Sequence, residues 1–167
     1  MKTKYAIIFV LINALAFISL LSCESSNDNQ TSYPVGEFSW EKWQSKAGWD
    51  DYSASDYTPS SEYISKILTA NQDRNISFII FTASWCPDSK SETPKIYKLF
   101  NALNTPLTSS RLFGVDRDKI EPTKTYLTYD LLKVPTLIVI EDGEEIGRIV
   151  EYPIKTWEED LLKILEK

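Results

Sequence analysis

The chain has 167 residues, of which 43% are apolar, 13% aromatic and 25% charged, which suits one globular domain with a processed N-terminus. Its net charge of −6 and the lack of a long basic run argue against a nucleic acid partner, because phosphate binding needs clustered Lys and Arg. The chain has no histidine and two cysteines, Cys23 and Cys86, which excludes Ser-His-Asp and Cys-His catalysis. A zinc site would lack its usual ligands, so we expect no metal.

The first 22 residues have the pattern of an export signal. Two lysines precede an almost wholly apolar stretch over residues 5–21, and a serine then comes directly before Cys23. This end resembles the lipobox of bacterial lipoprotein signals, although Leu21 stands where a smaller residue is more usual. The resemblance implies cleavage before Cys23 and attachment of diacylglycerol to its sulfur. The alternative is an uncleaved transmembrane anchor, for which residues 5–21 are at the lower limit of length.

Both interpretations place the rest of the chain outside the cytoplasm, in a bacterial cell envelope, and the first makes it lipid-anchored. A lipidated Cys23 is a thioether that can neither pair nor exchange. Cys86 is then the one thiol of the mature protein, so no intramolecular disulfide can form. Residues 23–32 are mostly polar and predict a flexible tether between the lipid and the domain.

Residues 33–59 form an aromatic-rich extension with three tryptophans. Ser39 is a suitable cap for a short helix that contains Trp40 and Trp43. We expect these aromatic side chains to pack on the domain. The alternative is a surface for a ligand or partner, because Trp and Tyr are favoured at binding hot spots.

Residues 60–167 predict one domain of alternating helices and strands. Apolar runs indicate strands over residues 76–82, 111–116, 134–140 and 145–150, and the last two are joined by a short turn. Apolar residues at helical spacing indicate helices after Pro59, after Cys86, and over residues 123–132 and 156–167. This order predicts an α/β fold with a central, mixed but mostly parallel sheet flanked by helices, and an antiparallel final hairpin.

The segment Ser84-Trp85-Cys86-Pro87-Asp88-Ser89 resembles the active-site motif of the thioredoxin family, in which Trp-Cys-x-x-Cys joins a core strand to a helix. Further positions match in order and spacing: Lys90, Pro94, Val134-Pro135-Thr136 and the Asp142-Gly143 turn. The resemblance implies a thioredoxin-like fold and a cis-proline loop that faces the cysteine. It also implies that an extended substrate pairs with the backbone at Val134, in a site formed by Trp85, Pro87, Val134 and Pro135.

Cys86 is the predicted nucleophile. A cysteine at a helix N-terminus faces unpaired backbone N–H groups and the positive end of the helix dipole. Both favour the thiolate, which is the form that attacks disulfides. The alternative is an inert cysteine on a fold that serves only for packing or binding.

Several residues depart from the thioredoxin pattern. Ser89 replaces the second motif cysteine, which resolves the mixed disulfide in that family, and a serine can instead donate a hydrogen bond to the Cys86 sulfur. Ile80 stands where many thioredoxins bury an aspartate as proton acceptor. Asp88 either opposes thiolate formation or is a favourable acid in the first turn of a helix. A peroxiredoxin shares the broad fold, but that family has a threonine where this chain has Ala83.

The sequence therefore predicts a membrane-tethered protein with oxidoreductase or isomerase-like activity. It would exchange thiols and disulfides with exported proteins or small thiols through Cys86 and Ser89, without a metal or an organic cofactor. The alternative from another class is a non-catalytic binding module that holds a partner protein in the thioredoxin groove or on the aromatic extension.

Overall fold

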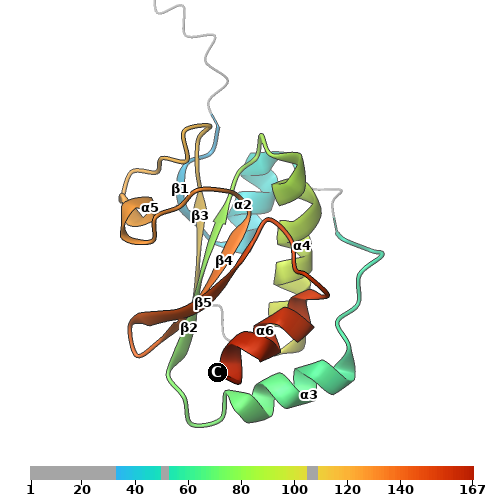
Figure 1. The fold of residues 1–167 in the computed structure, drawn as a ribbon. Coiled ribbons are helices and arrows are strands. Elements are labelled where there is room, and N and C mark those ends of the chain that lie inside the picture. Colours follow the sequence, from blue (N-terminus) through green and yellow to red (C-terminus); the bar gives the residue numbers. More distant parts are fainter. Residues whose placement is uncertain (1–32, 50–52, 105–108) are drawn as a thin grey trace, which may run out of the picture. The chain divides into compact units, whose positions relative to one another are not determined.

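The computed structural model describes residues 33–49, 53–104 and 109–167. At its centre is a sheet with the strand order β1-β3-β2-β4-β5 (Figure 1). The strands are Gly36–Phe38 (β1), Ile76–Thr82 (β2), Ser110–Gly114 (β3), Thr136–Glu141 (β4) and Glu144–Val150 (β5). The helices are Trp40–Ala47 (α2), Ser61–Ala70 (α3), Pro87–Ala102 (α4), Thr125–Thr128 (α5) and Trp157–Leu165 (α6). The predicted export signal and tether lie outside the described residues.

The sheet is mixed, as predicted, but it is not mostly parallel. Only β2 and β3 pair in parallel, whereas β1–β3, β2–β4 and β4–β5 are antiparallel. The reason lies in residues 115–135, which leave β3 and enter β4 at the same end of the sheet. A parallel strand needs a crossover that returns to the opposite end, usually through a long helix, and this connection contains only the four-residue α5.

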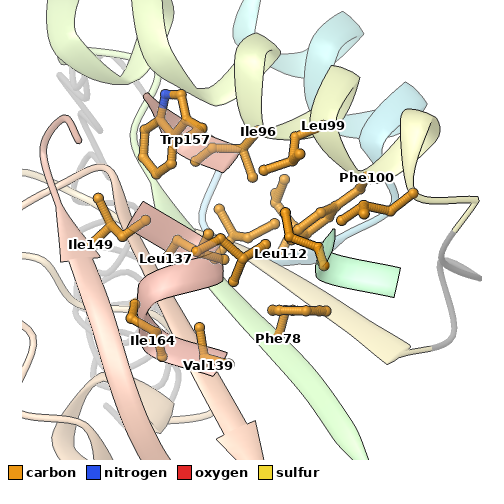
Figure 2. Packing of buried hydrophobic residues seen from close by; sticks show 14 of the residues in the cluster. Phe78, Ile96, Leu99, Phe100, Leu112, Leu137, Val139, Ile149, Trp157 and Ile164 are labelled. Atoms are coloured by element: carbon orange, nitrogen blue, oxygen red, sulfur yellow. The ribbon is translucent and has the colours of Figure 1, made fainter. Parts of the chain in front are cut away.

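Two hydrophobic clusters pack on the two faces of the sheet. Alternate residues of β2 point to opposite faces, so Phe78 and Ile80 belong to one cluster and Ile79 and Phe81 to the other. The first cluster joins the sheet to α2, α3, α4 and α6, and Figure 2 shows Ile96 and Trp157 over the strand residues. The second cluster lies under the connection that carries α5, on the other side of the sheet (Figure 1).

The predicted helix over residues 123–132 is shortened to α5, and a buried carboxylate lies at its start. Glu121 is 1% exposed and accepts hydrogen bonds from the backbone N–H groups of Thr123, Thr125 and Tyr126. These donors belong to the first turn and have no acceptor within a helix, so Glu121 caps the start of α5. The chain then turns at Asp130, which has a positive φ of 46°.

The aromatic extension is part of the first hydrophobic cluster. Trp43 and Trp49 are 0% and 2% exposed, and Trp40 stacks on Tyr97 of α4 with ring centroids 4.5 Å apart. The Ser39 side chain accepts from the N–H of Lys42 and caps α2, as the sequence indicates. The extension also contributes β1 at the sheet edge, a strand too short to be recognised from sequence periodicity.

The β4–β5 hairpin turns through Asp142 and Gly143, as the sequence indicates. Both residues have positive φ, 51° and 89°, which is the geometry of a tight two-residue hairpin turn. Within the described part of the chain, no helix combines the length and the apolar character needed to cross a membrane.

Glu158 joins α6 to the segment that precedes α3. The residue is 3% exposed, and its carboxylate accepts hydrogen bonds from the Tyr57 hydroxyl at 2.6 Å and the Ser60 N–H at 3.0 Å. Burial raises the pKa of Glu158, but these hydrogen bonds to the charged form outweigh it and hold the pKa below the usual value.

We predict that Glu158→Gln lowers the free energy of unfolding near pH 7 by about 1–3 kcal/mol, because a buried charge-assisted hydrogen-bond pair is lost. The pKa of Glu158 is lower in the folded than in the unfolded state. Its contribution is therefore complete above the unfolded glutamate pKa of about 4.3 and is lost as the pH falls through the folded value. Urea unfolding at several pH values should show wild type and variant converge in acid. The exposed Glu144→Gln is the control, and an equal difference at all pH values would contradict the assignment.

Candidate functional site

Cys86 lies where β2 passes into α4. Its backbone is extended, with φ −95° and ψ 120°, and it is the N-cap residue of the helix. Pro87 follows at the first helical position, where its missing N–H costs no hydrogen bond. The carbonyl of Cys86 accepts from the Lys90 N–H at 3.0 Å, which starts the helical ladder. The thiol is thus placed at a helix N-terminus, as the sequence predicts.

The sulfur of Cys86 faces the loop that enters β4. Its thiol donates to the carbonyl oxygen of Val134 at 3.4 Å, and only 8% of the residue is exposed. The Val134–Pro135 bond is cis, in agreement with the prediction for this loop. The structure therefore brings together Cys86, Pro87, Val134 and Pro135, which lie almost fifty residues apart in the sequence.

Ser89 is fully buried one helical turn after Cys86. Its hydroxyl oxygen accepts from the backbone N–H of Ala83 at 3.2 Å, which ties the first turn of α4 to the end of β2. The predicted hydrogen bond to the Cys86 sulfur is not among the contacts of the described residues, where the sulfur's partner is Val134. In this geometry Ser89 holds the loop that carries the thiol.

A pair of buried hydroxyls lies at the end of β2 and on α4. Sequence analysis had indicated that this strand carries no buried acid, because Ile80 takes that position. Thr82 and Thr93 are buried, and their Oγ1 atoms are 2.8 Å apart. Ile80 is 5% exposed and, with Thr93 and Trp40, lines a cavity of about 160 Å³. This hydrogen bond was not predicted, because no spacing rule links a strand residue to one on the following helix.

Trp85 forms one side of the site. The indole N–H donates to the carbonyl of Val115 at 3.1 Å, which anchors the ring on the segment after β3. The guanidinium of Arg117 lies over the same ring, 5.3 Å from its centroid. Sequence analysis assigned no role to Arg117, because only the tertiary fold places it on Trp85.

A charged pair lies beside the cis-proline loop. Lys133 precedes Val134, and its ammonium is 2.7 Å from the carboxylate of Glu151. Glu151 in turn donates its backbone N–H to the carbonyl of Pro135 at 2.7 Å. The hydrogen bond to Glu151 raises the pKa of Lys133, and the charge of Asp88 in the first turn of α4 adds to this rise. This ion pair, beside the cis-proline loop, was not predicted from the sequence.

Comparison with known proteins agrees with this geometry. A family model described as thioredoxin matches residues 51–163, more than half of the chain. Thioredoxin of Staphylococcus saprophyticus is 29% identical over 108 residues, which is 62% of this chain and 96% of that protein. Thioredoxin H5 of Arabidopsis thaliana is 27% identical over 85 residues, covering 51% of this chain and 67% of that protein.

Solved structures were compared in the same way. The crystal structure of Trxlp from Edwardsiella tarda is 21% identical and has a TM-score of 0.39, over 64% of this chain and 94% of that one. The family match, together with the thiol at the strand–helix junction and the facing cis-proline loop, supports a thiol–disulfide redox role in general terms. The chain belongs to the thioredoxin family.

Proposed function

We propose that this chain is a membrane-tethered, monothiol thioredoxin-like protein that exchanges thiols and disulfides with exported proteins or small thiols through Cys86. The observation that carries the proposal is the position of this thiol, at the N-terminus of α4 and against the carbonyl of Val134. The cis-proline loop offers backbone groups beside the thiol, where an extended substrate can pair.

Val134 supports the binding of an extended substrate. The backbone N–H of Val134 has no acceptor among the residues that the structure describes, although the residue is only 4% exposed. An incoming chain that adds as a strand would supply a carbonyl to this N–H. The sulfur of a substrate paired in this way would lie close to Cys86, because the thiol already contacts the Val134 carbonyl.

The chemistry needs an external partner to complete a cycle. The Cys86 thiolate attacks one sulfur of a substrate disulfide, a mixed disulfide forms, and the other substrate sulfur leaves as a thiolate. A second thiol, from the substrate or a small molecule, then attacks the mixed disulfide and releases Cys86. Cys86 is the one cysteine among the described residues, and Ser89 stands where a resolving cysteine would act. Each round exchanges partners with no net oxidation of the protein.

The sequence of the N-terminus supports the tether. The apolar stretch over residues 5–21 and Cys23 match an export signal with a lipidation site, and residues 24–32 are long enough to separate a domain from a membrane surface. The site would then face the cell envelope, where proteins with disulfides occur.

A binding module is the second candidate, and the low exposure of Cys86 favours it. A buried thiol reacts slowly unless its surroundings open, and side chains beside the cis-proline loop offer an apolar contact surface. Leu132 and Tyr152 are 78% and 63% exposed there. A partner held on this surface would need no turnover at Cys86.

We predict that Cys86 forms mixed disulfides when the full chain is expressed in a bacterial envelope. Cells are quenched with acid to trap thiols, and adducts are separated on non-reducing gels and identified by mass spectrometry. The adducts should disappear on reduction and in Cys86→Ala, because no other described residue carries a thiol. Recovery of Cys86 as a free thiol, with no adduct above that control, would contradict exchange and favour the binding module.

We predict that Ser89→Cys gains an intramolecular disulfide with Cys86, because the two positions lie one helical turn apart at the start of α4. The introduced thiol should resolve mixed disulfides, so trapped adducts should decrease relative to wild type. Mass spectrometry detects the disulfide as the loss of a pair of hydrogens. Ser91→Cys, on another side of the same helix, is the matched control. A folded Ser89→Cys variant that keeps both thiols free under oxidant would show that the site cannot support the exchange geometry.

A further inference from the structure

The four arginines of the chain fall into two classes by their partners. Three of them form two parallel hydrogen bonds with a glutamate: Arg74 with Glu141, Arg111 with Glu37, and Arg148 with Glu145. These distances are between 2.6 and 2.9 Å. In such bidentate ion pairs, two N–H groups of the planar guanidinium face the two oxygens of one carboxylate.

Arg117 is the exception. Its Nε donates to the Tyr33 hydroxyl at 2.8 Å, and its guanidinium lies over the rings of Tyr33 and Trp85, 5.4 and 5.3 Å from their centroids. Across residues 33–49, 53–104 and 109–167, no carboxylate is within ion-pair distance of Arg117. Its neighbour Asp116 is directed into its own turn, where its carboxylate accepts the N–H groups of Asp118 and Ile120.

The two rings hold the guanidinium in place while leaving its terminal nitrogens available. Cation–π contact and the hydrogen bond from Nε orient the group, and Arg117 as a whole is exposed. An oriented guanidinium loses little side-chain entropy when it binds a carboxylate. Trp85 directly precedes Cys86, so the ring that holds this cation belongs to the residue next to the thiol in the chain.

We propose that Arg117 is a specificity-determining residue of the Cys86 site. Its guanidinium binds a carboxylate that the substrate disulfide or thiol carries near the sulfur that reacts. The inference rests on the proposed function, because it concerns the substrate of the same thiol. The carboxylate belongs either to an acidic residue beside the target cysteine of a polypeptide or to a small peptidic thiol. Tyr33, from the extension, is then a positioning residue that acts through Arg117.

The test compares an anionic with a neutral disulfide on the full chain in detergent, with Cys23→Ser so that Cys86 is the one cysteine. The probes are 5,5′-dithiobis(2-nitrobenzoate) and 4,4′-dithiodipyridine. In both reactions the Cys86 thiolate forms a mixed disulfide and releases a coloured aromatic thiol or thione, which gives the rate. Arg117→Gln should slow the anionic probe by about tenfold and leave the neutral probe within about twofold of wild type.

Two matched variants separate recognition from general charge and from folding. Lys163→Gln makes the same change in net charge on the exposed side of α6 and should leave both rates unchanged. Tyr33→Phe keeps the ring and removes the hydroxyl that Nε contacts, so it should slow the anionic probe by a smaller factor. High salt should reduce the advantage of the anionic probe in wild type and not in Arg117→Gln.

A second arm identifies the source of the carboxylate. It compares the rates at which Cys86 reacts with glutathione disulfide and with the disulfide of an extended peptide that has Asp beside its cysteine. The substrate whose reaction slows in Arg117→Gln belongs to the preferred class. Equal slowing of the anionic and neutral probes by Arg117→Gln, or an equal effect of Lys163→Gln, would overturn the role of Arg117 while exchange at Cys86 stands. A wild-type thiol that reacts with neither probe would overturn the proposed function itself.

Discussion

The site depends on the antiparallel pairing of β4 with β2. Phe81 pairs with Thr136 in this register, so the end of β2 and the start of β4 lie at the same edge of the sheet. Cys86 follows β2 and the cis-proline loop precedes β4, which places the thiol against the carbonyl of Val134. A shift of one residue in this pairing would turn every side chain of β4 to the opposite face and would separate the two halves of the site.

The parts of the fold that were predicted correctly are those with a strong local signal. The bounds of β2, Ile76–Thr82, agree with its apolar run, and the Asp142-Gly143 turn agrees with its composition. The share of parallel strands was predicted wrongly, because the connection from β3 to β4 returns to the same end of the sheet, which the order of apolar runs does not show. The short α5 was missed because the chain turns at Asp130, whose positive φ is not evident from the spacing of apolar residues.

In the candidate site too, residues with a local sequence signal were predicted, and contacts that depend on the tertiary fold were not. Cys86 and Pro135 were found from a motif and its spacing, and the structure brings them together. The ion pair of Lys133 with Glu151 and the contact of Arg117 with Trp85 were not found, since each joins residues that only tertiary structure makes neighbours. The first of these contacts lies beside the cis-proline loop and the second involves the residue that precedes Cys86. General thiol chemistry thus follows from the local motif, whereas the proposed determinant of substrate choice, Arg117, lies outside it.

The central claim is that the fold makes Cys86 a reactive thiol in spite of its low exposure. The most direct measurement is the second-order rate constant of the native protein with a neutral disulfide, set against that of a free peptide with the sequence of residues 84–89 at the same pH. A site built for exchange predicts a native rate at or above that of the peptide. A native rate far below that of the peptide, which rises to the peptide value on unfolding, would show that Cys86 is a buried structural residue and would contradict the account.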